Sequence, residues 1–480
     1  MGNDKKNIIP LWARTGHQAP VTRRELLAAG LIPFAASLLV PKWTKLLLPS
    51  AAEAAASCAV PSSGMIPLIT LNLSGGAAMA GNFVPMDKAG QLLPNYDLVG
   101  LGDNQVPIAR EFGNVPFAGV NPANGVLISK MLQGIREMGP DSLGRTAFVG
   151  VPVRSRDDSS ENKFSIDGLT SKAGLVGSDL PNLGTNSNSA TGVSQKAAVL
   201  KTPAPLTVSG LNSITGSLGY AGAIGGSLNN SQKLSLAKLI NNLSQSQTAK
   251  LQALKNSTDV NSVLECAGIK SIDLVNKTPA VDPRLDAAIG AQLSTLWGVT
   301  ANTTNSDRNL IFSSVIYNVL KGNSGSGALQ LGGYDYHDNT RTTGDTKDLD
   351  AGRSIGRILQ TAHLMNKPVF IYVTSDGAVS SAQTNTRDSA WKSDRGSASV
   401  AYMLYFNPTG RAPTKNFQIG QFTSGQVADD TFITGGNPEI AATAVFANYL
   451  QLNNQMNLFS TIVPSNLFSV ANLDQVLMFG

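Results

Sequence analysis

Polar and glycine-rich segments lie next to four of the apolar runs that are predicted to form strands. Each segment holds groups that could ligate a cation or attack a substrate: residues 74–76 (SGG), 332–337 (GGYDYH), 374–377 (TSDG) and 393–396 (SDRG). In an open parallel sheet, functional groups collect where the strands end at their carboxyl side. We therefore expect these segments to meet at one edge of a sheet, although they lie far apart in the sequence.

Binding of a divalent cation is the first chemistry that these segments suggest. Asp335 and His337 have the spacing that places both side chains on one side of an extended segment. A carboxylate and an imidazole there could ligate a metal, and Asp376 and Asp394 could add oxygen ligands. Such an oxygen-rich set suits Ca²⁺ or Mg²⁺ better than Zn²⁺. The alternative is that the aspartates only cap turns and that His337 is an ordinary packed or surface residue.

Ser74 is the candidate for a catalytic nucleophile because it ends the first predicted strand. No base lies near it in the sequence, and a serine before Gly-Gly is common in turns, which is the alternative role. Apart from His337, the only histidine beyond the N-terminal segment is His363. It lies beside the apolar side of a predicted helix, so we expect it to pack rather than to bind a ligand.

Apolar runs and helical periodicity predict the elements that position these residues. Short β-branched runs predict buried strands at residues 65–73, 146–153, 328–331, 368–374 and 400–406. Helical spacing predicts helices at residues 124–138, 231–255, 283–296, 307–320, 348–365 and 438–450. Because strands alternate with helices and are apolar on both faces, we expect an α/β fold with a mainly parallel sheet sandwiched by helices.

Residues 154–230 differ in composition from the rest of the chain. Ser, Asn, Gly and Thr dominate there and aromatic residues are few, which indicates either a long surface excursion or a small, loosely ordered subdomain. The predicted organisation is a signal segment at 1–54, the first part of the α/β domain at 55–153, an insertion with a helical region at 154–300, and the second part of the domain at 301–480.

The N-terminal segment is typical of an export signal. An uncharged apolar run at residues 26–40 follows a basic stretch, and residues 52–54 (AEA) offer a small-x-small cleavage pattern. Arg23 and Arg24 resemble the pair of the twin-arginine signal. The apolar run is about 15 residues long, whereas a membrane span needs roughly 20. We expect twin-arginine export to the periplasm or beyond, with cleavage near residue 54; an uncleaved anchor is the alternative.

Charge excludes one class of partner. The chain has a net charge of +5, and residues 1–54 hold seven basic and three acidic residues, so +4 of that charge belongs to the signal segment. The remainder is close to neutral, and we therefore expect no nucleic-acid binding, which needs a clustered basic face. After cleavage no stable membrane span would remain. The expected partner is an envelope or extracellular protein.

Two cysteines, Cys58 and Cys266, are the remaining reactive residues. In an oxidising compartment they could pair and tie the mature N-terminus to the middle of the chain. The alternatives are two free thiols, or lipidation of Cys58. Residues 55–57 (AAS) disfavour lipidation because they lack the large aliphatic residue that such a site prefers.

The order of these segments resembles a bacterial family of domains of unknown function, which usually carries twin-arginine signals and is placed in the alkaline phosphatase and sulfatase superfamily. Its members show a Gly-Gly turn after the first strand, then Gly-Gly-Trp-Asp-Thr-His, Ser-Glu-Phe-Gly, Asp-His-Gly and a segment like Asp-Ile-Ala-Ala-Thr. The matching segments here are residues 74–76, 332–337, 375–377, 394–396 and 439–443. The similarity covers residues 65–100 loosely and 325–455 better.

This resemblance implies a two-metal or single-calcium site, with a nucleophile after the first strand, and the chain departs from both features. Ala78 stands about where the family often has serine. Arg395 replaces the histidine of the Asp-His pair. An arginine at a ligand position would replace the charge of the cation with its own, and it could form an ion pair with Asp394.

Two functions follow as predictions. The first is an exported alkaline phosphatase- or sulfatase-like domain that is catalytically degenerate and has a binding or structural role in the cell envelope. The alternative is a metal-dependent hydrolase of phosphate or sulfate esters, which would use Asp335, His337, Asp376 and Asp394 to hold Ca²⁺ or Mg²⁺.

Overall fold

A computed structural model describes most of the chain from residue 65 onward. The described residues are 65–93, 99, 107–155, 162–173, 182–185, 200, 205–218, single positions between 229 and 242, 282–336, 341–381, 391–392 and 395–479. The chain divides into two units, Met1–Cys58 with Gly219–Thr278, and Ala59–Leu218 with Pro279–Gly480. The second unit holds almost all described residues. The predicted signal with Arg23 and Arg24, and both cysteines, lie outside the described residues.

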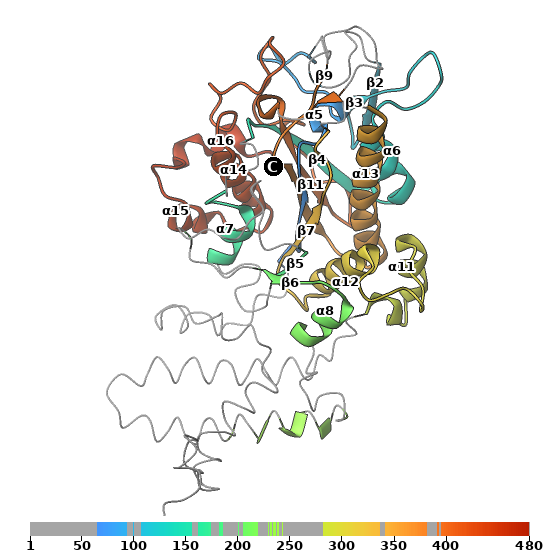
Figure 1. The fold of residues 1–480 in the computed structure, drawn as a ribbon. Coiled ribbons are helices and arrows are strands. Elements are labelled where there is room, and N and C mark those ends of the chain that lie inside the picture. The colour runs from blue at the N-terminus through green and yellow to red at the C-terminus, as the bar shows by residue number, and fades with distance from the viewer. Residues whose placement is uncertain are drawn as a thin grey trace, which may run out of the picture. The chain divides into compact units, whose positions relative to one another are not determined.

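A seven-stranded sheet forms the centre of the second unit. Its strands are β1 (Leu68–Leu73), β4 (Thr146–Pro152), β5 (Leu183–Gly184), β6 (Leu206–Thr207), β7 (Gly327–Leu331), β8 (Val369–Ser375) and β11 (Val400–Phe406). The order across the sheet is β4-β11-β8-β1-β7-β5-β6 (Figure 1). Only β11 runs antiparallel to its neighbours, β4 and β8, and all other pairings are parallel. The predicted α/β class with a mainly parallel sheet is confirmed.

Strand β1 lies in the middle of the sheet and carries no charged residue. It pairs with β7 on one side and β8 on the other, in the registers Leu73↔Leu331 and Leu73↔Ser375. All six residues of β1 are buried, as expected for a strand covered on both faces. The carboxyl ends of β7, β1 and β8 therefore lie side by side at one edge, which we call the carboxyl edge.

Helices cover both faces of the sheet (Figure 1). One face packs against α6 (Lys130–Met138), α12 (Arg308–Lys321) and α13 (Arg341–Leu364). The other face packs against α7 (Ile166–Lys172) and α14 (Pro438–Leu452). Since successive side chains of a strand point to opposite faces, Ile69 of β1 joins the first core and Leu68 joins the second.

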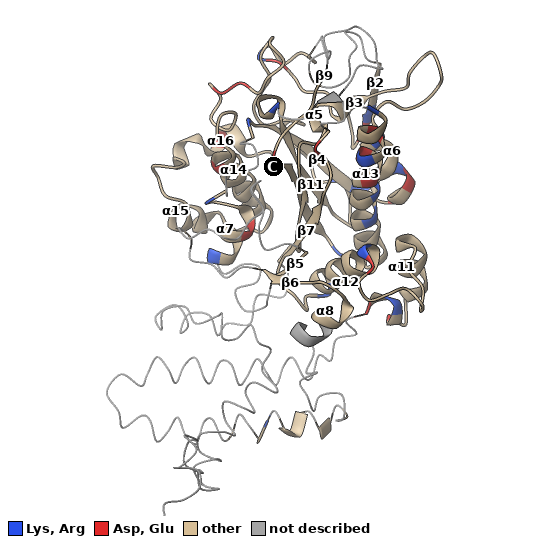
Figure 2. Ribbon diagram, in the orientation of Figure 1, with Lys and Arg blue, Asp and Glu red and all other residues tan. Residues whose placement is uncertain are grey.

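Helices α6 and α13 approach each other closely because glycines lie between them. A Cβ on Gly352 would stand 2.1 Å from the carbonyl oxygen of Met131, and one on Gly134 would stand 2.5 Å from the amide nitrogen of Arg353. Both helices carry charged residues of both signs (Figure 2), and the side chains of one pair, Arg353 and Glu137, join them at 2.8 Å. We call this contact the glycine seam.

Shorter elements complete the unit. They are α5 (Met79–Asn82), β2 (Ile108–Glu111), β3 (Val115–Ala118), η3 (Leu143–Arg145), α8 (Leu211–Leu218), η5 (Pro283–Leu285), α11 (Gly290–Trp297), β9 (Ser380–Ser381), β10 (Trp391–Lys392), η6 (Gly396–Ala398), η7 (Met456–Leu458), α15 (Phe459–Ile462), η8 (Val470–Asn472) and α16 (Leu473–Val476). Among the described helices, none combines the length and the apolar character that a membrane crossing requires. Most of the helix predicted at 231–255 lies outside the described residues.

Candidate functional site

The turn of Ser74, Gly75 and Gly76 joins the ends of three strands at the carboxyl edge. The amide of Ser74 donates to the carbonyl oxygen of Leu331 (2.8 Å), and the amide of Tyr334 donates to the carbonyl oxygen of Ser74 (3.0 Å). The pairing of β1 with β7 therefore continues past the end of both strands. Three of the segments that the sequence predicts to meet do so at this turn.

Glycines allow this close approach. Gly75 has a φ of 126°, and a Cβ there would stand 2.4 Å from the amide nitrogen of Asp335. On the β8 side, a Cβ on Gly377 would stand 2.7 Å from the carbonyl oxygen of Gly75. The backbone after β7 and the backbone after β8 thus both lie in close contact with Gly75, on two sides of it.

Two side chains at the end of β8 hold the turn. Asp376 is only 4% exposed, and its carboxylate accepts a hydrogen bond from the amide of Gly75. The hydroxyl of Ser375 donates to the carbonyl oxygen of Leu73 (2.7 Å) and accepts from the amide of Ala77 (2.8 Å). We call these contacts the backbone clip. Ser375 thus binds the main chain on either side of the turn, and Asp376 binds the turn itself.

Asp335 lies on the other side of Gly75 and differs from Asp376 in burial. It is exposed, whereas its neighbours Tyr334 and Tyr336 are fully buried, so it points to the solvent side of this segment. The other two predicted ligands, His337 and Asp394, lie outside the described residues. Within the described residues, no group of three or more His, Cys, Asp or Glu is arranged to hold a metal ion.

The remaining predicted positions have ordinary surroundings. Ala78 is buried, and the hydroxyl of Ser74 has no hydrogen-bond partner among the described residues. The guanidinium of Arg395 donates to the carbonyl oxygens of Gly425 (3.1 Å) and Gln426 (3.3 Å), which fastens a neighbouring loop to the carboxyl edge. The ring of His363 packs edge-on against Phe406.

A buried polar cluster beside the turn was missed from the sequence. Asp348 of α13 is 1% exposed and accepts a hydrogen bond from the side-chain amide of Asn82 (2.7 Å), while the hydroxyl of Tyr336 lies 3.5 Å away. Burial raises the pKa of Asp348 to about 8. The available signal was its spacing, because Asp348 lies seven residues before Ile355 on the apolar side of the helix.

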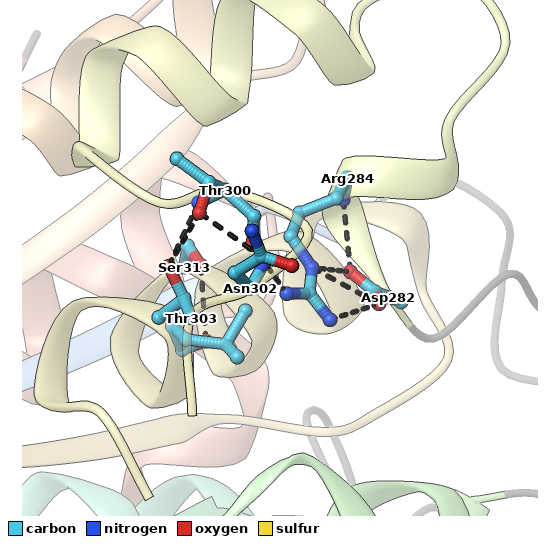
Figure 3. A network of polar contacts seen from close by, with 7 residues as sticks. Asp282, Arg284, Thr300, Asn302, Thr303 and Ser313 are labelled. Carbon is cyan, nitrogen blue, oxygen red and sulfur yellow. Dashed lines mark hydrogen bonds and ion pairs between the residues drawn. The ribbon is translucent and has the colours of Figure 1, made fainter. Parts of the chain in front are cut away.

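Another polar cluster lies where the chain enters α11 and α12 (Figure 3). Arg284 donates through Nη2 to Asp282 (2.8 Å) and through Nη1 to the carbonyl oxygen of Thr300 (2.7 Å). Nearby, Asp286 accepts from the hydroxyl of Tyr317 (2.6 Å) and from Lys321 (3.1 Å). Because α12 leads into the start of β7, this corner lies at the amino edge of the sheet, away from the turn.

No family model matches the chain, and no curated protein and no solved structure shows significant similarity to it. Its function therefore has to be argued from the carboxyl edge. Chemically, the described groups there supply one exposed carboxylate, one buried carboxylate engaged with an amide, and a serine hydroxyl at the end of β1.

Proposed function

We propose that the chain is an exported domain of the alkaline phosphatase and sulfatase type that has lost its catalytic site and has a binding or structural role in the cell envelope. The backbone clip is the observation that carries this proposal. Asp376 accepts from the Gly75 amide, and Ser375 bridges Leu73 and Ala77. In a hydrolase, side chains at these positions would be directed at a cation or a substrate. In this chain, Asp376 and Ser375 bind the main chain instead.

Two departures from the family pattern support the same interpretation. A buried alanine, Ala78, occupies the position where the resemblance leads one to expect a nucleophile. Arg395, in place of a histidine ligand, directs its guanidinium at two carbonyl oxygens. A guanidinium cannot ligate a metal, because it is a permanent cation and has no free lone pair.

The second candidate function is a metal-dependent hydrolase of phosphate or sulfate esters. The observation that favours it is that Asp335 and Asp376 adjoin the same glycine, Gly75. Asp335, Asp376, His337 and Asp394 would hold Ca²⁺ or Mg²⁺, which would polarise the ester oxygen.

Export is part of the proposal. Arg23, Arg24 and the apolar run at residues 26–40 support the twin-arginine route to the periplasm or beyond. The partner that we propose is an envelope or extracellular protein, since export would place the chain outside the cytoplasm; the near-neutral charge of the chain without residues 1–54 argues against nucleic acid.

The test is metal content and turnover of the purified exported chain. We expect no stoichiometric metal and no hydrolysis of nitrophenyl phosphate or nitrophenyl sulfate above the level of the Asp335→Ala variant, with Ca²⁺, Mg²⁺ or Zn²⁺ added. Asp376→Asn is the matched control, because an amide oxygen can still accept from Gly75 while the charge that a cation needs is gone. Bound metal with turnover that both variants lose would establish the hydrolase instead.

A further inference from the structure

Asp348 is a buried acid that forms no ion pair with any of the described residues. Among the described side chains, none forms an ion pair with it; Arg341, on the preceding turns of α13, pairs with Asp345 at 3.6 Å. A carboxylate buried without a cation is costly, and the group avoids the cost by staying protonated. Desolvation by burial is accordingly the main reason that the pKa of Asp348 is raised to about 8.

The two hydrogen bonds of Asp348 do not offset the cost of its burial. Oδ2 accepts from the side-chain amide of Asn82 (2.7 Å) and Oδ1 accepts from the hydroxyl of Tyr336 (3.5 Å); both donors favour the ionised form, but desolvation outweighs them. Among the described residues, the titratable and charged groups around Asp348 are Tyr334 and Tyr336 after β7, Asp345 and Arg341 on α13, and Tyr402 on β11. Only Arg341 carries a positive charge in this set, and its ion-pair partner is Asp345.

Asn82 connects Asp348 to three other residues, at the starts of α5 and α6. Its amide nitrogen also donates to the carbonyl oxygen of Ala78 (2.9 Å), the N-cap residue of α5. Its oxygen accepts from the hydroxyl of Ser129 (2.9 Å) and from the amide of Met131 (3.0 Å), at the start of α6. Helix α5 begins three residues after Gly76, so Asn82 fixes the chain that leaves the backbone clip.

We propose that Asp348, Asn82 and Tyr336 form a pH-sensitive latch, which holds α5 and the segment after β7 in place while Asp348 is protonated and releases them when it ionises. An exposed aspartate ionises near pH 4, so the opened form loses its proton at a much lower pH than the closed form. The latch is therefore tightest below about pH 4. The equilibrium constant between the opened and the closed form of the latch rises about tenfold per pH unit above about pH 4, and it levels off above about pH 8.

Hydrogen exchange of the full chain between pH 6 and pH 9, corrected for intrinsic rates, tests this inference independently of the proposed function. The reporters are the amides of Asn82 and Met131, and amides of α14 are the reference. In the unmodified chain we expect reporter opening to rise up to about tenfold per pH unit and to flatten above about pH 8. Asp348→Asn keeps a side chain that can hydrogen-bond to Asn82 and Tyr336 but cannot titrate. In this variant, the opening measured at the reporter amides should be independent of pH.

Asp345→Asn is the matched control, because it removes an acid of the same helix and should leave the pH dependence in place. The inference is overturned if Asp348→Asn retains the rise, or if Asp345→Asn abolishes it. A second measurement needs no variant that might misfold: the carboxyl ¹³C shift of Asp348 should titrate near pH 8 in the unmodified chain. A titration near pH 4 would equally overturn the latch.

Discussion

Asp286 and Asp348 each lie against a tyrosine hydroxyl, at opposite edges of the sheet, and their electrostatic surroundings differ. Asp286 at the amino edge accepts from Tyr317, from Lys321 and from two backbone amides. The hydrogen bond from Tyr317 is the main reason that the pKa of Asp286 is well below its ordinary value. Asp348 at the carboxyl edge has no such set of donors, and burial raises its pKa to about 8.

The comparison shows that burial and hydrogen-bond donors together decide the charge of a covered acid. The Asp286 side chain is 11% exposed and less deeply enclosed than Asp348, and its donors favour the ionised form. The two edges therefore respond to pH in opposite directions. Asp286 contributes stability that is present above about pH 4 and is lost as pH falls through its lowered pKa. The stability that Asp348 contributes is lost as pH rises towards about 8.

The largest effect is expected from Asp348→Ala. The change removes one of the two acceptors of the Asn82 side-chain amide and opens a cavity in the packed interior. We expect the free energy of unfolding at about pH 4, below which Asp348 is protonated in the folded and the unfolded chain alike, to fall by about 3 kcal/mol, measured by urea denaturation. A fall below about 1 kcal/mol would mean that the carboxyl edge does not depend on this acid.

Asp286→Ala should have the next largest effect, about 2 kcal/mol at pH 7, because it removes the acceptor of Tyr317 and of Lys321. The variant should also be less sensitive to acid, since the stability that the unmodified chain loses below about pH 4 is partly that of Asp286. Urea denaturation from pH 3 to pH 7 checks both points. Equal acid sensitivity in the two chains would contradict the comparison.

Tyrosine-to-phenylalanine changes sharpen the comparison between the edges. Tyr317→Phe should cost about 1.5 kcal/mol and move the pKa of Asp286 up towards its ordinary value, because this hydroxyl is the main cause of the shift. In Tyr336→Phe, the pKa of Asp348 should stay raised, since burial is its main cause. Carboxyl ¹³C titrations of both variants measure the two values. A return of the Asp348 pKa to its ordinary range in Tyr336→Phe would break the distinction.

Lys321→Met should have the smallest effect, below about 1 kcal/mol, because the Lys321 side chain is 43% exposed and solvent screens its charge. The pKa of Asp286 should stay lowered, since Tyr317 and the backbone amides remain as donors. Thermal unfolding at low and high salt provides the check. A loss as large as that of Tyr317→Phe would make the cation, rather than the hydroxyl, the main partner of Asp286.

The main strands and most helix boundaries could be predicted because they depend on local patterns. The helix predicted at 307–320 is α12, and Asp307 caps it by accepting from the amide of Leu310. Helix α13 begins at Arg341, seven residues before its predicted start. Its first turns (RTTGDTK) are mostly polar, so they lack the apolar spacing from which a helix is inferred.

At the site, the sequence could predict the meeting of strand ends but not the partners that each side chain finds there. The approach of Asp335 and Asp376 to Gly75 follows from parallel strands that end at one edge. The backbone clip joins residues about 300 positions apart in the sequence. No local sequence pattern reveals that the carboxylate of Asp376 accepts a hydrogen bond from an amide so distant in the chain. The burial of Asp348 is likewise a product of tertiary packing.

The glycine seam limits how this face of the sheet can move. At Gly134 and Gly352 main chain rests on main chain, so at these two points no side chain lies between α6 and α13 that could change rotamer and absorb a displacement. Sliding or rolling of one helix over the other would bring backbone atoms into collision. A displacement of α13 at Asp348 would therefore also move α6 and its capping residue, Ser129.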